Sequence, residues 1–454
     1  MQLSQHIPKL QPTVMLVLLM LFVSVAHANK TLKDSDFHTV ADKQAEVGRL
    51  LFYDKILSGN RNISCGTCHH PAFGTSDGLS LGIGEGGVGI GPSRTTGSDA
   101  DRIERRVPRN APALWNLGAK EIKLLMHDGR ISHSHLYDNN FNTPAQEWLP
   151  QGLNSILAAQ ALFPMTSETE MAGSNEENEV AGASNDRIDN PWPIIAKRVR
   201  NNADYARLLV EAFDSIRQPE QITIVPIANA LAAFNSSEFK SNDSPYDRWL
   251  NGDNTALSPL QLQGQSLFFG KATCSNCHSG ALFSNHKFKA LALPAFGPGR
   301  TRSHDPIPRD VGRMGESDRL QDAYRFRVPM LRNVSLTAPY GHNGAYPTLK
   351  AMINHHRDPL AARKSWNSEM ANLPTADWLA EVDFVIAQDK LEMQRQTEKV
   401  DINLPAINDQ EVDALIAFLD SLTGDQALAR DFTIPTVVPS GLPVDNPEPH
   451  TYQQ

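Results

Sequence analysis

The sequence has little cysteine, no excess of positive charge and, beyond its N-terminal region, no long apolar run. Its 42 Lys and Arg residues are outnumbered by 51 Asp and Glu residues, which gives a formal net charge of -9. No basic stripe indicates a nucleic-acid partner. Downstream of the N-terminal region, no stretch is long and apolar enough to cross a membrane. The 454 residues suffice for roughly two or three domains.

The N terminus has the pattern of an export signal. An apolar run extends from Val14 to Val25, and Ala26-His27-Ala28 follows with small residues at the positions that a signal peptidase recognises. The run is too short to span a bilayer comfortably, so an uncleaved anchor is the less favoured alternative. We therefore predict a signal peptide over residues 1–28 and a periplasmic protein that starts near Asn29.

Only four cysteines are present, and they form two pairs with the same spacing. The pairs lie in the segments Cys65-Gly66-Thr67-Cys68-His69 and Cys274-Ser275-Asn276-Cys277-His278. Two short disulfides or one tetrathiolate zinc site would use the same four thiols. A histidine directly after each pair favours a different chemistry, because Cys-x-x-Cys-His is the attachment signature of c-type haem.

The chemistry of haem attachment explains this spacing. Two thiols bond to the two vinyl groups on one edge of the porphyrin, and the next side chain places an imidazole nitrogen on the iron. The sequence therefore predicts two covalent c-type haems, with His69 and His278 as iron ligands. The attaching residues are Cys65, Cys68, Cys274 and Cys277.

Similar residues precede the two motifs. Gly48-Arg49-Leu50-Leu51-Phe52 lies before the first and Gly264-Gln265-Ser266-Leu267-Phe268 before the second, each as a short amphipathic helical pattern. Strand patterns are few and short. We predict a mainly α protein with long irregular loops, built from two cytochrome-c-like haem domains in tandem.

This weak repeat sets the expected domain boundaries. An N-terminal haem domain is predicted over residues 29–220 and a C-terminal haem domain over 221–430. An extended tail is predicted over 431–454. Residues 172–190 are polar, acidic and poor in apolar side chains, so we expect a mobile surface loop there.

Several longer segments match one protein family. They are PRNAPALWN at 108–116, HDGR at 127–130, PMTSETEM at 164–171, DVGR at 310–313 and FRVPMLRNVSLTAPYGHNG at 326–344. Together with the two haem motifs, they make the chain resemble the bacterial dihaem cytochrome c peroxidases and their MauG-type relatives from about Ala45 to Gly424. The resemblance implies two-electron reduction of hydrogen peroxide, with electrons from a small periplasmic redox protein such as a cytochrome c or a cupredoxin.

The resemblance assigns the peroxide reaction to the first haem. Family members place a glutamate acid–base group above its open face, and that position falls on Glu170, with Glu168 as the rival. The loop after the first motif has Glu85 where relatives often have a distal histidine. We therefore expect this haem to be open already in the oxidised state, with His133 and His135 as alternative distal ligands.

The resemblance assigns electron relay to the second haem. Its sixth ligand lies at a fixed distance after the Pro-Tyr-x-His-x-Gly segment, where relatives have methionine or tyrosine and this chain has His356. His355, Met330 and Met314 are the alternatives. A second imidazole, unlike methionine, favours ferric iron.

Other residues are assigned by their match to positions near the two haems. His127 stands where relatives usually have a tryptophan that relays electrons, and Arg327 matches an interhaem arginine. Trp115 is an alternative relay, although it matches a packing position. His342 is expected to pack or donate a hydrogen bond near the second haem without binding its iron.

The resemblance also implies a calcium ion between the domains. Asn110, Thr337 and Pro339 match the residues that supply its ligands, an asparagine side chain and two backbone carbonyls. Oxygen donors of this kind suit a hard cation. Hydrogen bonding within the loops is the alternative role for the three residues.

Three functions are compatible with the sequence. The first is a peroxidase that reduces hydrogen peroxide with electrons from a small redox protein. The second is a MauG-like enzyme that uses peroxide to oxidise residues of a partner protein. The third is an electron carrier without peroxide chemistry. A homodimer is consistent with each of them.

Overall fold

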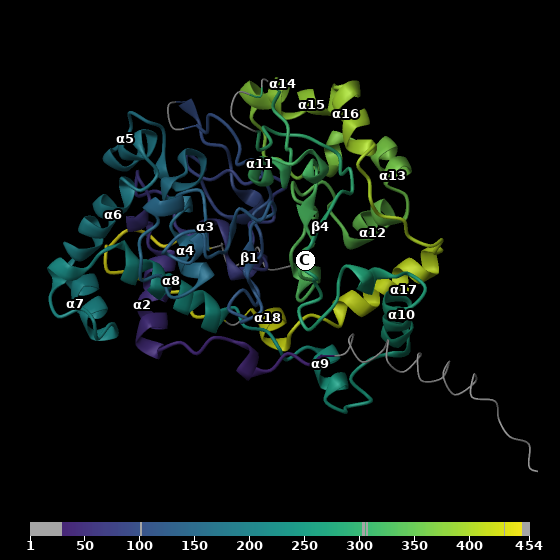
Figure 1. Cartoon of the computed structure of the whole chain (residues 1–454), viewed down its shortest axis with the longest axis horizontal. Helices are drawn as coiled ribbons and strands as arrows, with labels where there is room; N and C mark the ends of the chain where they lie inside the picture. The colour runs from purple at the N-terminus through teal and green to yellow at the C-terminus, as the bar shows by residue number, and fades with distance from the viewer. Residues whose placement is uncertain (1–29, 100–101, 302–304, 306, 431, 447–454) are drawn as a thin grey trace, which may run out of the picture.

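The computed structural model describes residues 30–99, 102–301, 305, 307–430 and 432–446 (Figure 1). The predicted signal peptide therefore lies outside the described residues. Within the described part of the chain, no helix has both the length and the apolar character needed to cross a membrane.

Helices joined by long irregular loops dominate the structure, as predicted. The first half of the chain contains α2 (Asp42–Tyr53), α3 (Cys65–Cys68), α4 (Ile156–Ala161), α5 (Glu179–Asp186), α6 (Pro191–Arg200), α7 (Ala203–Ala212) and α8 (Ile224–Glu238). The second half contains α9 (Pro245–Leu250), α10 (Pro259–Phe269), α11 (Met314–Ser317), α12 (Leu349–Arg357), α13 (Pro359–Ser365), α14 (Ala380–Asp383), α15 (Val385–Gln388), α16 (Lys390–Thr397), α17 (Asp409–Asp420) and α18 (Asp425–Ala429).

The strands are short and antiparallel. β1 (Leu124–Leu125), β2 (Ile131–His133) and β3 (Phe141–Asn142) form one sheet in that order, and β4 (Phe288–Lys289) pairs with β5 (Phe326–Arg327). Phe288 lies opposite Arg327 in the second pair. This pairing brings residues from either side of the 291–313 loop region together near the middle of the molecule.

Two equivalent helix crossings form the framework of the molecule. Helix α2 packs on α8, and α10 packs on α17, each through a glycine (Figure 1). A Cβ atom added to Gly48 would lie 1.9 Å from the carbonyl oxygen of Ala230. A Cβ atom added to Gly264 would lie 1.9 Å from the carbonyl oxygen of Ala414. The sequence repeat before the two motifs therefore reflects a repeated helix pair in the structure.

Helix α8 packs with the N-terminal unit, although it follows the predicted boundary. Ile227 and Phe234 of α8 belong to the same buried cluster as Leu51 of α2. A boundary at residues 220 and 221 would separate these two helices and expose the apolar surface that they share. The packing of α8 therefore favours an N-terminal unit that extends to Phe239.

The 172–190 segment is not the surface loop that its composition predicted. It contains helix α5, and the side chain of Asn178 caps that helix by accepting hydrogen bonds from the N–H groups of Val180 and Ala181. Val180 is fully buried and joins the core of the N-terminal unit. The polar residues that suggested a loop are the cap and the solvent-facing side of a short helix.

The C-terminal tail is extended, but it is bound to the N-terminal unit. Ser440 Oγ donates a 2.6 Å hydrogen bond to Asp54, and Asp445 accepts from Thr67 and pairs with Lys55, both at 2.6 Å. The partly buried tail residues Phe432, Ile434, Leu442 and Val444 pack against the N-terminal core. The last part of the described chain therefore returns across the molecule (Figure 1).

Replacing Gly48 by alanine should lower the thermal stability of the protein. The added Cβ would force α2 away from α8, which we expect to cost about 1–3 kcal/mol of unfolding free energy. Gly182→Ala in α5 is the matched control, because its Cβ would have no neighbour closer than 3.5 Å. Thermal unfolding followed by circular dichroism measures both variants. Equal melting temperatures for Gly48→Ala and wild type would contradict this packing.

Candidate functional site

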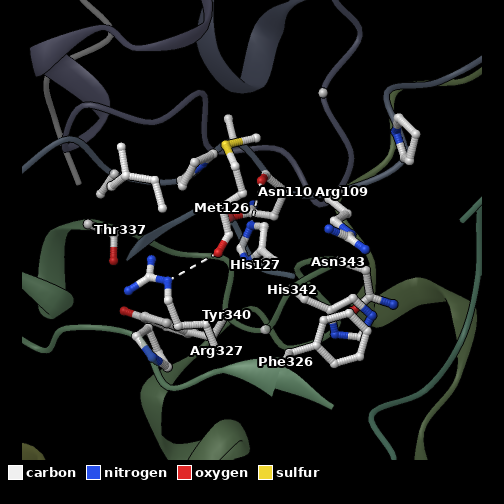
Figure 2. A pocket seen from close by; sticks show the side chains of 18 of the residues that line it. Arg109, Asn110, Met126, His127, Phe326, Arg327, Thr337, Tyr340, His342 and Asn343 are labelled. Carbon is white, nitrogen blue, oxygen red and sulfur yellow. Dashed lines mark hydrogen bonds between the residues drawn. The ribbon is translucent and has the colours of Figure 1, made fainter. Parts of the chain in front are cut away.

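One large cavity lies between the two units. Its volume is about 920 Å³, and residues of both Cys-x-x-Cys-His motifs line it. Figure 2 shows part of its wall. All four cysteines lie in the described part of the chain, and none forms a disulfide. The two motifs are therefore brought to one shared space, with their four thiols unpaired.

Helix α3 and the residue after it hold the first motif. The Nδ1 atom of His69 lies 3.1 Å from the carbonyl oxygen of Thr75. A carbonyl only accepts hydrogen bonds, so Nδ1 carries the proton and Nε2 keeps a free lone pair. Burial raises the pKa of the Cys65 and Cys68 thiols to about 12, and the carboxylates of nearby residues add to this effect at Cys68.

The second motif orients its histidine in the same way. Nδ1 of His278 lies 3.2 Å from the carbonyl oxygens of Phe283 and Pro329. Its Nε2 is again left with a free lone pair. Burial and, to a smaller extent, the proximity of His356 lower the pKa of His278 to about 4. Both motif histidines are thus neutral and oriented as iron ligands require.

The structure distinguishes among the four candidates for the second sixth ligand. His356 lines the cavity, and its Nδ1 lies 2.9 Å from the carbonyl oxygen of Met352, which leaves Nε2 free. His355 does not line the cavity, and both of its ring nitrogens have partners. Met314 packs in a separate buried cluster, whereas Met330 lines the cavity.

His355, also on α12, contacts Leu291 and Tyr346 through its two ring nitrogens. Its Nε2 lies 2.7 Å from the carbonyl oxygen of Leu291, and its Nδ1 lies 2.8 Å from the hydroxyl oxygen of Tyr346. The side chain is fully buried. These contacts give His355 a structural role that fixes α12 and, with it, the neighbouring His356.

Glu170 lies in a helical turn over Glu168–Ala172 and faces the cavity. Burial raises the pKa of its carboxyl group, while nearby Arg130 and a hydrogen bond from Ser167 oppose that rise. Glu168 instead pairs with Arg105 and does not line the cavity. Of the two glutamates, only Glu170 is placed to act there.

The loop after the first motif supports the Glu170 turn. A Cβ atom added to Gly84, whose φ is +65°, would lie 2.0 Å from the carbonyl oxygen of Thr169. That oxygen also accepts a 3.2 Å hydrogen bond from the N–H of Glu85. Only glycine tolerates both this φ and this approach. Glu170 is therefore positioned by the loop that follows the first motif.

None of the three residues considered as a distal group of the first motif lines the cavity. The Glu85 carboxylate accepts hydrogen bonds from Asn60 and Asn62 at 2.9 and 2.6 Å. His133 and His135 are exposed, and His133 packs on Phe141 with 5.1 Å between ring centroids. Among these candidates, no side chain covers the space beside Glu170.

His127 and Arg327 lie together in the cavity wall (Figure 2). Nε2 of His127 lies 3.2 Å from the carbonyl oxygen of Asn110, and Nε of Arg327 donates to the carbonyl oxygen of Met126 at 3.1 Å. The backbone N–H of Arg327 donates to the carbonyl oxygen of His127 at 2.7 Å. Burial lowers the pKa of His127 to about 4, helped by the charge of Arg109.

Arg327 is a half-buried cation with no carboxylate partner in the described part of the chain. Its Nη1 has no hydrogen-bond partner, and no carboxylate pairs with it in the described part of the chain. Burial alone lowers the pKa of its guanidinium to about 10. A half-buried arginine facing a cavity favours an anionic occupant. The two propionates of a haem are such anions, so the wall fits the group that the motifs predict.

A buried ionic network that was not predicted from the sequence closes one side of the cavity. Asp128 accepts hydrogen bonds from Arg109, Arg130 and Arg300 at 2.6, 3.1 and 3.0 Å. Arg109 also pairs with both carboxylate oxygens of Asp310, at 2.6 and 2.8 Å. Although burial would raise it, the three arginines hold the pKa of Asp128 far below its usual range. The HDGR and DVGR segments both contribute residues to this ionic network.

Asp77 is a second buried carboxyl group that sequence reasoning missed. It lines the cavity, is 1% exposed, and its Oδ2 has no hydrogen-bond partner among the described residues. Burial raises its pKa to about 7, against the charge of Arg94. In the sequence, only the position of Asp77 before Gly78, shortly after the first motif, could have indicated that this residue lies at the site.

Asn110, Thr337 and Pro339, the residues matched to a calcium site, all line the cavity. Nδ2 of Asn110 donates to the carbonyl oxygen of Leu79 at 2.7 Å, and Thr337 Oγ1 donates to the carbonyl oxygen of Val334 at 3.0 Å. No group of three or more His, Cys, Asp or Glu side chains in the described chain could hold a metal ion. A cation here would therefore depend on neutral oxygen ligands.

Two aromatic side chains pack as their motif positions suggested. Trp115 is 3% exposed and packs against Phe239 and Phe432, while part of it reaches the cavity. His342 stacks on Phe326 with 3.6 Å between ring centroids (Figure 2). Both rings line the cavity.

Comparisons with known proteins agree with this geometry. Residues 42–255 match the family model of di-haem cytochrome c peroxidases. The methylamine utilization protein MauG of Methylorubrum extorquens is 28% identical over 331 residues, which cover 72% of each chain. The cytochrome c551 peroxidase of Nitrosomonas europaea is 26% identical over 406 residues, which cover 89% of this chain and 86% of the relative.

A solved structure extends the likeness to the whole fold. The structure of a MauG-like protein associated with microbial copper homeostasis aligns with a TM-score of 0.56 and 25% identity, covering 89% of this chain and 96% of that one. The chain is thus similar to the di-haem cytochrome c peroxidases, and this similarity implies two c-type haems.

Proposed function

We propose that the protein is a periplasmic dihaem peroxidase that reduces hydrogen peroxide to water with electrons from a small redox protein. The observation that supports this proposal most strongly is that both haem motifs, Glu170 and His356 line one cavity. The relatives named as peroxidases support this reaction. A tetrathiolate zinc site or two disulfides would use only the thiols. Neither would give a role to the free Nε2 lone pairs of His69, His278 and His356.

The residues present fit two haems. Each pair of thiols would attach one haem, and the Nε2 atoms of His69 and His278 would bind the two irons. When bound, the haems supply the iron centres that exchange electrons with peroxide and with the reductant. Arg327 would pair with a propionate, which gives its charge a partner. We assign the two tandem units as two haem domains on this basis.

Glu170 is proposed as the acid–base group. Reduction of peroxide consumes two protons and two electrons and yields two water molecules. A carboxylate above the first site takes a proton from the nearer peroxide oxygen and returns it to the leaving oxygen. The raised pKa of Glu170 suits it to both steps, because its carboxyl group regains a proton more readily than that of an exposed glutamate.

The two sites are proposed to be unequal. The first is open, because the nearby candidates Glu85, His133 and His135 do not line the cavity. The second is closed by His356, with Met330 as the remaining alternative. Two imidazoles stabilise ferric iron, so the second site is suited to holding oxidising equivalents.

Export, calcium and assembly stay predictions. The signal pattern at residues 1–28 supports a periplasmic location. A calcium ion held by Asn110, Thr337 and Pro339 would join elements of the two units through the cavity wall. His127 and Arg327 are proposed as the relay between the haems. A homodimer stays an expectation.

A MauG-like reaction on a protein substrate is the second candidate. His127 stands in place of the usual tryptophan, and its low pKa keeps it neutral. His356 in place of methionine also favours oxidised iron. Rapid steady-state turnover with reduced cytochrome c supports the peroxidase, whereas slow turnover with a long-lived oxidised state supports the second candidate.

Replacing Glu170 by glutamine should slow the reaction with peroxide by about 10²–10⁴-fold. In the wild type, the rate should fall as the pH is lowered through a pKa above the usual 4.5, because the base must be unprotonated. That acid limb should be absent in the variant. Stopped-flow kinetics test this, with Glu168→Gln as the matched control that keeps the wild-type rate. An unchanged rate in Glu170→Gln would place the active site elsewhere.

Replacing His356 by alanine should convert the second haem from low spin to high spin, because its iron would lose a strong-field ligand. The ferric absorption and electron paramagnetic resonance spectra measure the change. Met330→Leu is the control, since it alters the remaining cavity-lining candidate without removing an imidazole. A low-spin spectrum that persists in His356→Ala and is lost in Met330→Leu would reassign the ligand.

A further inference from the structure

The loop that follows the first motif, residues 77–85, contacts more than the cavity. We call it the first-site loop. Three of its residues line the cavity, namely Asp77, Gly82 and Gly84. Three apolar residues of the same loop have no exposed surface and do not line the cavity, namely Leu79, Leu81 and Ile83. These three side chains must therefore be covered by another part of the protein.

The C-terminal unit covers them. Leu79 and Ile83 share a buried cluster with Ala376 and Leu379. The other buried members of the cluster that contains Leu81 all come from the C-terminal unit, namely Leu293, Phe296, Ala345 and Tyr346. We call residues 372–383, which end with helix α14, the bridging segment. The first-site loop of one unit is thus packed against the bridging segment of the other.

Hydrogen bonds hold the loop and the bridging segment in one register. The N–H of Asn372 donates to Oγ of Ser80 at 2.8 Å, and the N–H of Ser80 donates to the carbonyl oxygen of Asn372 at 3.0 Å. Nδ2 of Asn372 donates to the carbonyl oxygen of Gly78 at 2.6 Å. Buried backbone groups need such partners, so the contact cannot slide without losing them.

A buried ion pair strengthens the same contact. Arg106 and Asp383 are 2% and 6% exposed, and Nε of Arg106 lies 3.0 Å from both carboxylate oxygens. Nη2 of Arg106 also donates to the carbonyl oxygen of Pro374 at 2.8 Å. The next residue, Val107, donates its N–H to the carbonyl oxygen of Gly82 at 2.9 Å. Removing either charge would leave the other buried and unpaired.

The far end of the first-site loop contacts the turn that carries Glu170. The carbonyl oxygen of Thr169 accepts a 3.2 Å hydrogen bond from the N–H of Glu85. The same oxygen lies so close to Gly84 that a Cβ atom there would be 2.0 Å away. Close-packed interiors transmit displacements. A shift of the loop therefore moves Thr169 and, with it, the adjacent Glu170.

We propose that the C-terminal unit positions Glu170 through the first-site loop, with Asn372 and Asp383 as positioning residues. The inference rests on the proposed function, in which Glu170 is the acid–base group. It adds that the unit carrying the second haem motif also sets the geometry of the first site. Neither positioning residue lines the cavity, so both act through the loop.

Weakening the contact should change the reaction with peroxide in the haem-loaded protein. In Asp383→Asn the rate should fall about tenfold, because a small displacement of an acid–base group is costly. Asn372→Ala should lower it by a smaller factor. Asn372 is exposed, so its replacement tests the same contact if Asp383→Asn does not fold. Stopped-flow kinetics measure both variants.

The pH profile separates positioning from a general loss of stability. Release of the turn exposes Glu170 to water, so its pKa should fall towards 4.5 and the acid limb of the rate should move to lower pH. The groups that act on Glu170 are Arg130, Arg300 and Ser167, and the variants leave all three in place.

Asn367→Ala is the matched control for Asn372→Ala. Asn367 is also exposed, and its side chain accepts a hydrogen bond from the N–H of Glu369 without contacting the first-site loop. This variant should keep both the rate and the acid limb of the wild type.

Hydrogen–deuterium exchange without peroxide separates this inference from the proposed function. Exchange should become faster in residues 77–85 and 168–172 of both variants and stay unchanged in Asn367→Ala. Faster exchange in the loop alone, with an unmoved acid limb, would overturn the inference. Unchanged exchange in both segments would overturn it as well. Faster exchange in both segments, in a protein whose Glu170→Gln variant keeps the wild-type rate, would uphold the positioning and overturn the proposed function.

Discussion

Three imidazoles at the central cavity share one hydrogen-bonding constraint. His69, His278 and His356 each direct Nδ1 at a backbone carbonyl, at 3.1, 3.2 and 2.9 Å. A carbonyl cannot donate, so each ring keeps its proton on Nδ1 and its lone pair on Nε2. The backbone thus sets the tautomer before any iron is present. The proposed coordination of both haems depends on this arrangement.

The charged side chains of the cavity also suit it to holding two haems. Three arginines neutralise Asp128, whereas Arg327 is half-buried without a carboxylate partner in the described chain. Burial raises the pKa of Glu170, which keeps it able to exchange a proton. The paired charges around Asp128 belong to the framework of the cavity. The unpaired Arg327 and Glu170 instead mark the places where an anion would bind and a proton would be exchanged.

The sequence predicted the parts that local spacing encodes. The mainly α class and the repeat before each motif could be read because each pattern lies within a few residues, whereas the attachment residues stay a prediction. The role of α8 could not, since periodicity shows that a helix has an apolar side but not which helix covers it. Composition missed α5, because a single cap at Asn178 reverses the meaning of a polar stretch. The Arg109–Asp310 pair joins residues 201 positions apart, beyond the reach of any local pattern.

The account claims that the two haem sites differ in ligation, one open beside Glu170 and one closed by His356. The electron paramagnetic resonance spectrum of the untreated ferric protein tests this most directly. We predict one high-spin and one low-spin haem in equal amounts, with the high-spin signal lost when peroxide is added. Two low-spin signals that do not respond to peroxide would contradict the account.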